Sequence, residues 1–213
     1  MIVDERIITF INSLDTKNSE ILEDIEREAL ADNVPIIRRE MQSFLKVLLM
    51  VKKPMRVLEV GTAVGFSALL MSEYVPEECA ITTIENYEKR IPIARQNFVR
   101  AGKEKKITLL EGDAMDVLKT LEGPYDFIFM DAAKGQYIHY LPEILRLLAK
   151  GGILVSDNVM QDGDVIESRF AVERRDRTIH ARMREYLYEL KHNDALVTSI
   201  IPLGDGVALS IKR

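Results

Sequence analysis

The chain has 213 residues, 47% of them hydrophobic and 30% charged, with a formal net charge of −5. This composition is ordinary for a water-soluble globular protein, and no apolar run approaches the roughly 18 residues that would cross a bilayer. The length favours one α/β domain over residues 1–213, made of an N-terminal helical segment at 1–50 and a core at 51–213. The single cysteine, Cys79, excludes an intrachain disulfide and a cysteine-based zinc site. The acidic N-terminus lacks the pattern of a signal peptide, so we expect a cytoplasmic protein that does not bind membranes.

Helical periodicity and short apolar runs divide the chain into successive elements. Helices are expected first, at 4–14, 17–31 and within 34–53, with Asn18 or Ser19 as the N-cap of the second. From residue 56 onward, apolar runs alternate with helical segments. The predicted strands are 56–60, 80–84, 106–110, 125–130 and 152–156. The predicted helices are 65–74, 87–101, 114–120, 137–149 and 178–192.

The chain ends in LVTSIIPLGDGVALSIKR, two apolar runs joined by a Gly-Asp-Gly turn, which is typical of a β-hairpin. The earlier strands are continuously apolar, as expected where helices cover both faces of a parallel sheet. The sequence therefore predicts an α/β fold with a mostly parallel, doubly wound sheet, a C-terminal antiparallel hairpin and N-terminal helices.

Ligands of such sheets bind outside the carboxyl ends of the strands. The first strand runs into EVGTAVGFS, where a dinucleotide fingerprint would need glycines at 61, 63 and 66. The chain has Gly61, Ala63 and Phe66, so this fingerprint is absent. Glu59 would also repel a pyrophosphate, whereas a cofactor with a cationic amino group tolerates it.

The same edge offers partners for the parts of S-adenosylmethionine. Gly61 and Gly65 allow close approach of the backbone, and the helix N–H groups with Ser67 can bind a carboxylate. Glu85, after the second strand, is placed to accept hydrogen bonds from two ribose hydroxyls, and Asp113 can reach an adenine amino group. The alternatives are a solvated acid for Glu85 and a helix cap for Asp113.

A second group of polar residues follows the fourth and fifth strands. It consists of Asp131, Asp157 and Asn158, with Lys134 one turn from Asp131. Two carboxylates and an amide suit Mg²⁺, Mn²⁺ or Ca²⁺ and not zinc. The alternative is that the two acids are ordinary turn residues.

Several motifs together resemble the divalent-metal-dependent O-methyltransferases, a family that includes catechol and caffeoyl-CoA enzymes. They are VLEVGTAVGFSALLMS, TTIENYEKRIPIARQNF, EGDA, FIFMDAAKGQYIHY, ILVSDNV and PLGDGVALSIKR. The resemblance, from about residue 34 to 213, implies a Rossmann-like class I methyltransferase fold, a homodimer, metal binding by Asp131, Asp157 and Asn158, and Lys134 as the catalytic base. The predicted cofactor residues are Glu59, Gly61, Gly65, Ser67, Glu85, Asp113, Ala114 and Asp131.

The methyl acceptor is predicted from charge and from resemblance. Residues 169–184 contain six arginines against Glu173 and Asp176, a local charge of +4. The motifs resemble those of bacterial enzymes that methylate 5-hydroxyuridine at the tRNA wobble position, and arginines suit phosphates and bases. The predicted tRNA patch is Arg38, Arg39, Arg174, Arg175 and Arg177. The alternatives are a solvated helix face and a small catechol-like or acyl-CoA substrate.

Overall fold

The computed structural model describes residues 3–213, so the first two residues of the predicted N-terminal segment lie outside the described residues. The strands are β1 (Arg56–Val60), β2 (Ala80–Glu85), β3 (Ile107–Glu111), β4 (Tyr125–Met130), β5 (Leu148–Ser156), β6 (Leu196–Ile201) and β7 (Val207–Lys212). The α-helices are α1 (Glu5–Ser13), α2 (Glu20–Ala31), α3 (Arg39–Lys52), α4 (Phe66–Tyr74), α5 (Ile91–Arg100), α6 (Ala114–Thr120), α7 (Tyr137–Leu147) and α8 (Arg177–His192). Two 3-10 helices are η1 (Lys134–Gln136) and η2 (Gln161–Ile166).

The seven strands form one sheet in the order β3-β2-β1-β4-β5-β7-β6. Strands β1 to β5 pair in parallel, and β7 pairs antiparallel with both β5 and β6. The predicted α/β fold, with its doubly wound sheet and C-terminal hairpin, is therefore confirmed. The strand order reverses between β1 and β4, which is where such sheets bind ligands.

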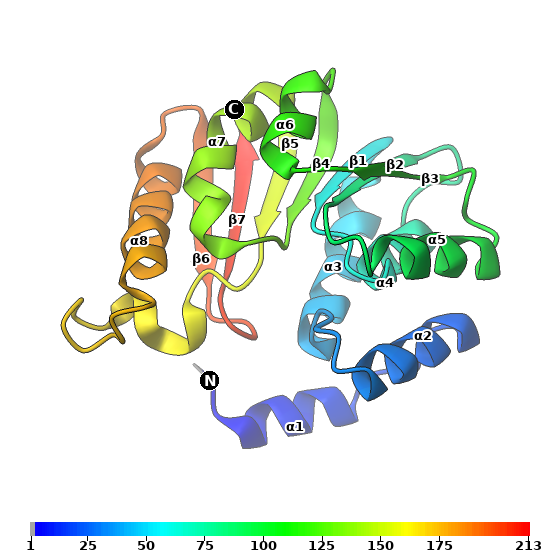
Figure 1. Cartoon of the computed structure of the whole chain (residues 1–213), viewed down its shortest axis with the longest axis horizontal. Helices are drawn as coiled ribbons and strands as arrows, with labels where there is room; N and C mark the ends of the chain where they lie inside the picture. The colour runs from blue at the N-terminus through cyan, green and yellow to red at the C-terminus, as the bar shows by residue number, and fades with distance from the viewer. Residues whose placement is uncertain (1–2) are drawn as a thin grey trace.

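Helices cover both faces of this sheet (Figure 1). Helices α2 to α5 pack on one face against side chains such as Phe127 and Phe129. Helices α6 to α8 pack on the other face against Ile128 and Met130. Successive residues of β4 thus point to opposite faces of the sheet, and each face has its own hydrophobic core. This explains why the strand is continuously apolar.

Three elements begin more than three residues away from the predicted position. Helix α3 begins at Arg39, and residues 34–38 are not helical, although the predicted helical spacing starts at Val34. Helix α5 begins at Ile91, because Pro92 fits only the first turn of a helix. Strand β5 begins at Leu148 and runs through Gly151, at a point where its register with β4 shifts.

The N-terminus of α2 confirms the position of the predicted cap but not its chemistry. Ser19 is the N-cap residue, yet its hydroxyl makes no capping hydrogen bond. The Glu23 carboxylate instead accepts a hydrogen bond from the Asn18 backbone N–H at 3.0 Å. Across residues 3–213, no helix combines the length and apolar character needed to span a membrane.

Candidate active site

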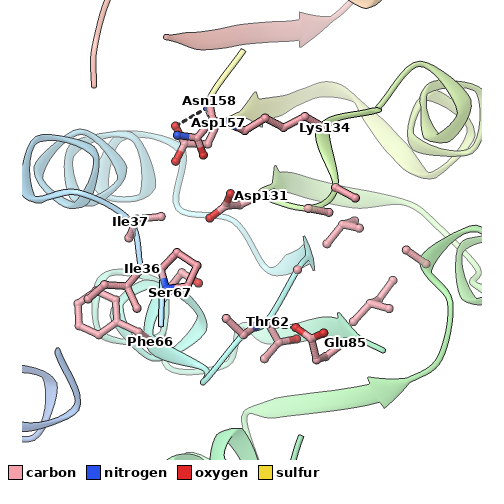
Figure 2. A pocket seen from close by; sticks show the side chains of 18 of the residues that line it. Ile36, Ile37, Thr62, Phe66, Ser67, Glu85, Asp131, Lys134, Asp157 and Asn158 are labelled. Carbon is pink, nitrogen blue, oxygen red and sulfur yellow. Dashed lines mark hydrogen bonds between the residues drawn. The ribbon is translucent and has the colours of Figure 1, made fainter. Parts of the chain in front are cut away.

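A cavity of about 590 Å³ opens at the carboxyl ends of β1, β2, β4 and β5. Its wall contains most of the residues predicted to bind ligands, and Figure 2 shows several of them facing a common space. The predicted residues that line it are Arg38, Gly61, Ser67, Glu85, Ala114, Asp131, Lys134, Asp157 and Asn158. Segments as far apart in the sequence as those of Arg38 and Asn158 thus meet at one edge of the sheet.

Asp131 and Asp157 continue the ladder of the sheet by one residue beyond β4 and β5. The backbone N–H of Asp131 donates to Val60 at 3.0 Å, and that of Asp157 donates to Met130 at 2.9 Å. The buried Tyr137 hydroxyl contacts the carbonyl oxygens of Met130 and Asp157 at 3.1 and 3.2 Å. These contacts fix the backbones that carry both carboxylates.

Both carboxylates are hard to ionise in this setting. Burial raises the pKa of Asp131 and of Asp157, and the charge of Asp131 raises that of Asp157 further. Lys134 lowers both pKa values but is a single cation facing two acids. Within residues 3–213, no third His, Cys, Asp or Glu side chain lies close enough to these two acids to form a metal-binding group. Asn158 lines the same cavity, so its amide would supply the third protein oxygen. Two repelling carboxylates beside an amide fit a hard divalent cation.

Lys134 begins η1 and also lines the cavity. Its ammonium lies 3.4 Å from a carboxylate oxygen of Asp205, in the turn between β6 and β7. The Lys134 side chain is 31% exposed, so it remains accessible from the cavity. It could therefore exchange a proton with a bound molecule.

Gly61 is required for packing as well as for access. It adopts a φ of +104°, and a Cβ there would lie 2.0 Å from the carbonyl oxygen of Asp131. The glycine thus lets the loop after β1 touch the backbone of a predicted metal ligand. Ser67, in the first turn of α4, is 8% exposed and lines the cavity nearby.

Glu85 is held by three backbone donors. Its carboxylate accepts hydrogen bonds from the N–H groups of Ala63, Asn86 and Tyr87 at 2.7, 3.0 and 2.8 Å. These bonds fix its orientation at the cavity wall, where Figure 2 places it beside Thr62. Asn86 and Tyr87 donate to one oxygen and Ala63 donates to the other, which keeps acceptor capacity because a carboxylate can accept about four hydrogen bonds in all.

Glu59 is fully buried and lies outside the cavity lining. The Thr83 hydroxyl donates to it at 2.5 Å and contacts the Thr62 hydroxyl at 2.5 Å. Burial raises the pKa of Glu59 to about 7, against the opposing hydrogen bonds of Ser67 and Thr83. The acid is therefore hydrogen-bonded beneath the glycine loop, and its predicted contact with the cofactor stays a prediction.

Two other predicted cofactor residues also lie outside the lining. Asp113 caps α6, and its carboxylate accepts from the Met115 N–H at 2.9 Å, so the helix cap is observed while the contact with adenine stays a prediction. Gly65 has a φ of +86°, and a Cβ there would lie 2.5 Å from the Phe98 ring. Packing and backbone conformation explain this glycine without a ligand.

Sequence reasoning missed one wall of the cavity. The segment of residues 35–38, of which only Arg38 was predicted, lines it together with Met41, and Figure 2 shows Ile36 and Ile37 beside Phe66. Tyr140 and Asp205 are among the other lining residues that were not predicted. The proline at position 35 was a signal for extended backbone in this segment.

The predicted arginine patch is divided by the structure. Arg38 lines the cavity and approaches Asp162 at 3.9 Å. Arg39 pairs instead with Glu26 of α2 at 3.1 Å. The two arginines are therefore engaged with different acids.

The arginines of α8 and the preceding segment are mostly engaged within the protein. Arg175 pairs with Glu173 and Asp176 at 3.0 and 3.3 Å. Three others donate to backbone carbonyls: Arg177 to Val172, Arg182 to Gly135 and Arg184 to Val165. Arg169 and Arg174 are exposed. Only part of the predicted +4 charge therefore faces solvent freely.

A sequence profile of the O-methyltransferase family matches residues 12–213. The chain belongs to this family. A catechol O-methyltransferase of Niastella koreensis is 35% identical over 128 residues, 58% of this chain and 58% of that protein. Caffeoyl-CoA O-methyltransferase 2 of Populus trichocarpa is 33% identical over 183 residues, 78% of this chain and 70% of that protein. The S-adenosylhomocysteine-bound Podospora anserina methyltransferase PaMTH1 superposes with a TM-score of 0.89 at 26% identity, over 98% of this chain and 94% of that one.

Family membership confirms the predicted enzyme class. The chain is an S-adenosylmethionine-dependent O-methyltransferase with a Rossmann-like sheet, in agreement with the cofactor-bound neighbour. The cavity lies at the topological switch point where this fold binds its cofactor.

Proposed function

We propose that this O-methyltransferase uses a divalent cation held by Asp131, Asp157 and Asn158 to methylate one of two adjacent oxygen atoms. The paired buried carboxylates at the carboxyl ends of β4 and β5 carry this proposal. Such a cation would supply the positive charge that lowers the pKa of a neighbouring hydroxyl. An amide and two acids on adjacent strands suit a cation that prefers oxygen ligands.

The chain's own residues provide binding, orientation and proton transfer. The neutral amine form of Lys134 accepts the proton of the acceptor hydroxyl and becomes the ammonium. Ser67 and the N-terminus of α4 bind the cofactor carboxylate, and Glu85 binds its ribose. Ile36, Ile37 and Phe66 form an apolar wall that limits water. Holding the two reactants in line provides several kcal/mol of the acceleration, on the order of 7 in favourable cases.

A small molecule with two adjacent hydroxyls is the acceptor that the relatives favour. Those relatives are named catechol and caffeoyl-CoA O-methyltransferases. A cavity of about 590 Å³ has room for a cofactor and part of a small acceptor. Arg38 at the cavity wall would suit an acceptor that also carries negative charge.

A second candidate acceptor is 5-hydroxyuridine in tRNA, whose adjacent oxygens resemble a catechol pair. It is supported by exposed Arg169 and Arg174, which make no ion pair within residues 3–213, and by Phe170, which is 86% exposed between them. Arginines and exposed aromatics suit single-stranded RNA. The engagement of Arg39, Arg175 and Arg177 within the protein weakens this candidate relative to the small molecule.

One experiment separates the acceptors. The purified protein is given S-adenosylmethionine, Mg²⁺ and, in turn, a catechol, a hydroxycinnamoyl-CoA thioester and anticodon stem-loop RNA that contains 5-hydroxyuridine. Product mass is measured, and each acceptor is matched by one that lacks the second oxygen. We expect methylation only of acceptors with the adjacent pair. Equal methylation of the matched controls would contradict the two-oxygen mechanism.

We also propose that the protein forms a homodimer, as the family resemblance implies. Helix α1 has no buried residue and exposes Ile7, Phe10 and Leu14, while α3 exposes Met50 and Val51. Exposed apolar residues on neighbouring helices suit an interface between copies. Light scattering coupled to size exclusion should give twice the mass of 24.3 kDa, and a monomer mass at micromolar concentration would contradict this.

A further inference from the structure

Asp205 is a buried acid that has no part in the chemistry described above. It lies in the turn between β6 and β7, is 3% exposed and lines the cavity. Its neighbours Gly204 and Gly206 have φ values of +56° and +82°. A Cβ at Gly206 would lie 2.1 Å from the Met160 side chain, so the turn packs closely against the loop after β5. The Val159 N–H also donates to the Gly206 carbonyl at 2.9 Å, which helps to hold the Asp205 carboxylate at the cavity wall.

The two carboxylate oxygens of Asp205 have separate partners. One oxygen lies 3.4 Å from the ammonium of Lys134. The other accepts a hydrogen bond from the Asp162 backbone N–H. The backbone carbonyl of Asp205 also accepts from the Met160 N–H at 2.9 Å. Asp205 thus joins the turn to the loop after β5 and, independently, to Lys134.

A third acid in this place needs a compensating partner. The charge of Asp205 raises the pKa of Asp157, so its ionised form adds to the repulsion around Asp131 and Asp157. A buried charge is unfavourable unless it is paired. Among residues 3–213, Asp205 does not form a metal-binding group with the other two acids. It forms an ion pair with Lys134 instead.

We infer that Asp205 is a positioning residue that holds the Lys134 ammonium beside the Asp131 and Asp157 pair. This inference rests on the proposed role of Lys134 as the proton acceptor. A lysine side chain has four rotatable bonds and loses rotamer freedom when it is fixed. One immobile carboxylate restricts that freedom before the acceptor binds. Asp205 acts through Lys134 and does not touch the reacting atoms.

Two substitutions separate this role from a merely structural one. Asp205→Asn keeps an oxygen for the Asp162 N–H but presents an NH₂ group to Lys134. Asp205→Ala removes both contacts. We expect Asp205→Asn to melt close to the parent protein and to bind S-adenosylmethionine with unchanged affinity. We expect its kcat to fall about tenfold or more, within the range for a misplaced general base, while KM changes less than about twofold.

A double-mutant cycle tests whether Asp205 acts through Lys134. If it does, the variant with Lys134→Met and Asp205→Asn is no slower than Lys134→Met alone. Losses that multiply, or an Asp205→Asn kcat within twofold of the parent, would overturn the inference.

A second readout does not depend on activity. Acetic anhydride labels free amines, and mass spectrometry gives the labelling rate of each lysine in the cofactor-free protein. Asp205→Asn should raise the labelling rate of Lys134 several-fold, while the rate at the exposed Lys119 stays constant. An unchanged Lys134 rate overturns the inference. If Lys134→Met keeps full activity, Lys134 is not the proton acceptor and that part of the proposed function fails. The labelling rate then still tests whether Asp205 positions Lys134.

Discussion

Replacing Glu59 with glutamine should flatten the pH dependence of the stability of the cofactor-free protein. Glu59 is fully buried beneath the glycine loop, and burial raises its pKa from 4.5 to about 7. The folded protein therefore holds this proton more tightly than the unfolded chain does. The resulting contribution to stability is complete below pH 4.5 and is lost as the pH rises through about 7.

The magnitude follows from the size of this pKa difference. At about 1.4 kcal/mol per pH unit, a rise from 4.5 to about 7 corresponds to about 3 kcal/mol in total. Roughly 2.5 kcal/mol of this falls between pH 5 and pH 8. Glutamine does not titrate, so Glu59→Gln should lose that much less stability than the parent over the same interval.

Urea unfolding at pH 5, 6, 7 and 8 measures the effect. The other buried acids titrate in both proteins, so the difference between the two curves isolates Glu59. The exposed Glu104→Gln is the matched control, and its curve should parallel that of the parent. Parent and Glu59→Gln curves that stay parallel within about 0.5 kcal/mol would refute the assignment of Glu59 as a protonated buried support.

Three further predictions follow from the site. Glu85→Ala should weaken S-adenosylmethionine binding by about 1.5–3 kcal/mol in calorimetry, and an unchanged affinity would mean that Glu85 is not the ribose ligand. Gly61→Ala should lower thermal stability and abolish cofactor binding together, since its Cβ would lie 2.0 Å from the Asp131 carbonyl; a variant with parental melting temperature would contradict the packing argument. If tRNA is the acceptor, replacing Arg169 and Arg174 with alanine should flatten the log–log salt dependence of tRNA binding by about 0.7–0.9 per lost phosphate contact, and a parallel salt titration would remove these residues from any RNA surface.

The sheet and the positions of Asp131 and Asp157 at the cavity were predictable because their signals are local. Continuous apolar runs mark strands that are buried on both faces, and Phe127 to Met130 indeed face two cores. The acids that follow strands must meet at the carboxyl edge of a parallel sheet. Asp131 and Asp157 therefore needed no tertiary information beyond the fold class.

The rest of the site depends on contacts between distant segments. Residues 35–38 line the cavity because Ile36 and Ile37 pack against the core that includes the sheet. The helical spacing of the neighbouring residues does not predict this packing. Glu59 and Gly65 both occur in the cofactor motif. In the structure, Glu59 accepts a hydrogen bond from Thr83, and Gly65 packs against the ring of Phe98. Lys134 pairs with Asp205, which lies 71 residues further along the chain. The two residues meet only when β7 pairs with β5 in the assembled sheet.

The central claim is that Asp131, Asp157 and Asn158 hold a divalent cation that the methyl transfer requires. The direct measurement is the initial rate of methyl transfer from S-adenosylmethionine to a catechol, first after chelation and then across a titration of Mg²⁺ or Mn²⁺. We expect no transfer in excess chelator, full recovery on addition of the cation, and no recovery in Asp157→Ala although that variant still binds the cofactor. Full activity in excess chelator would contradict the account.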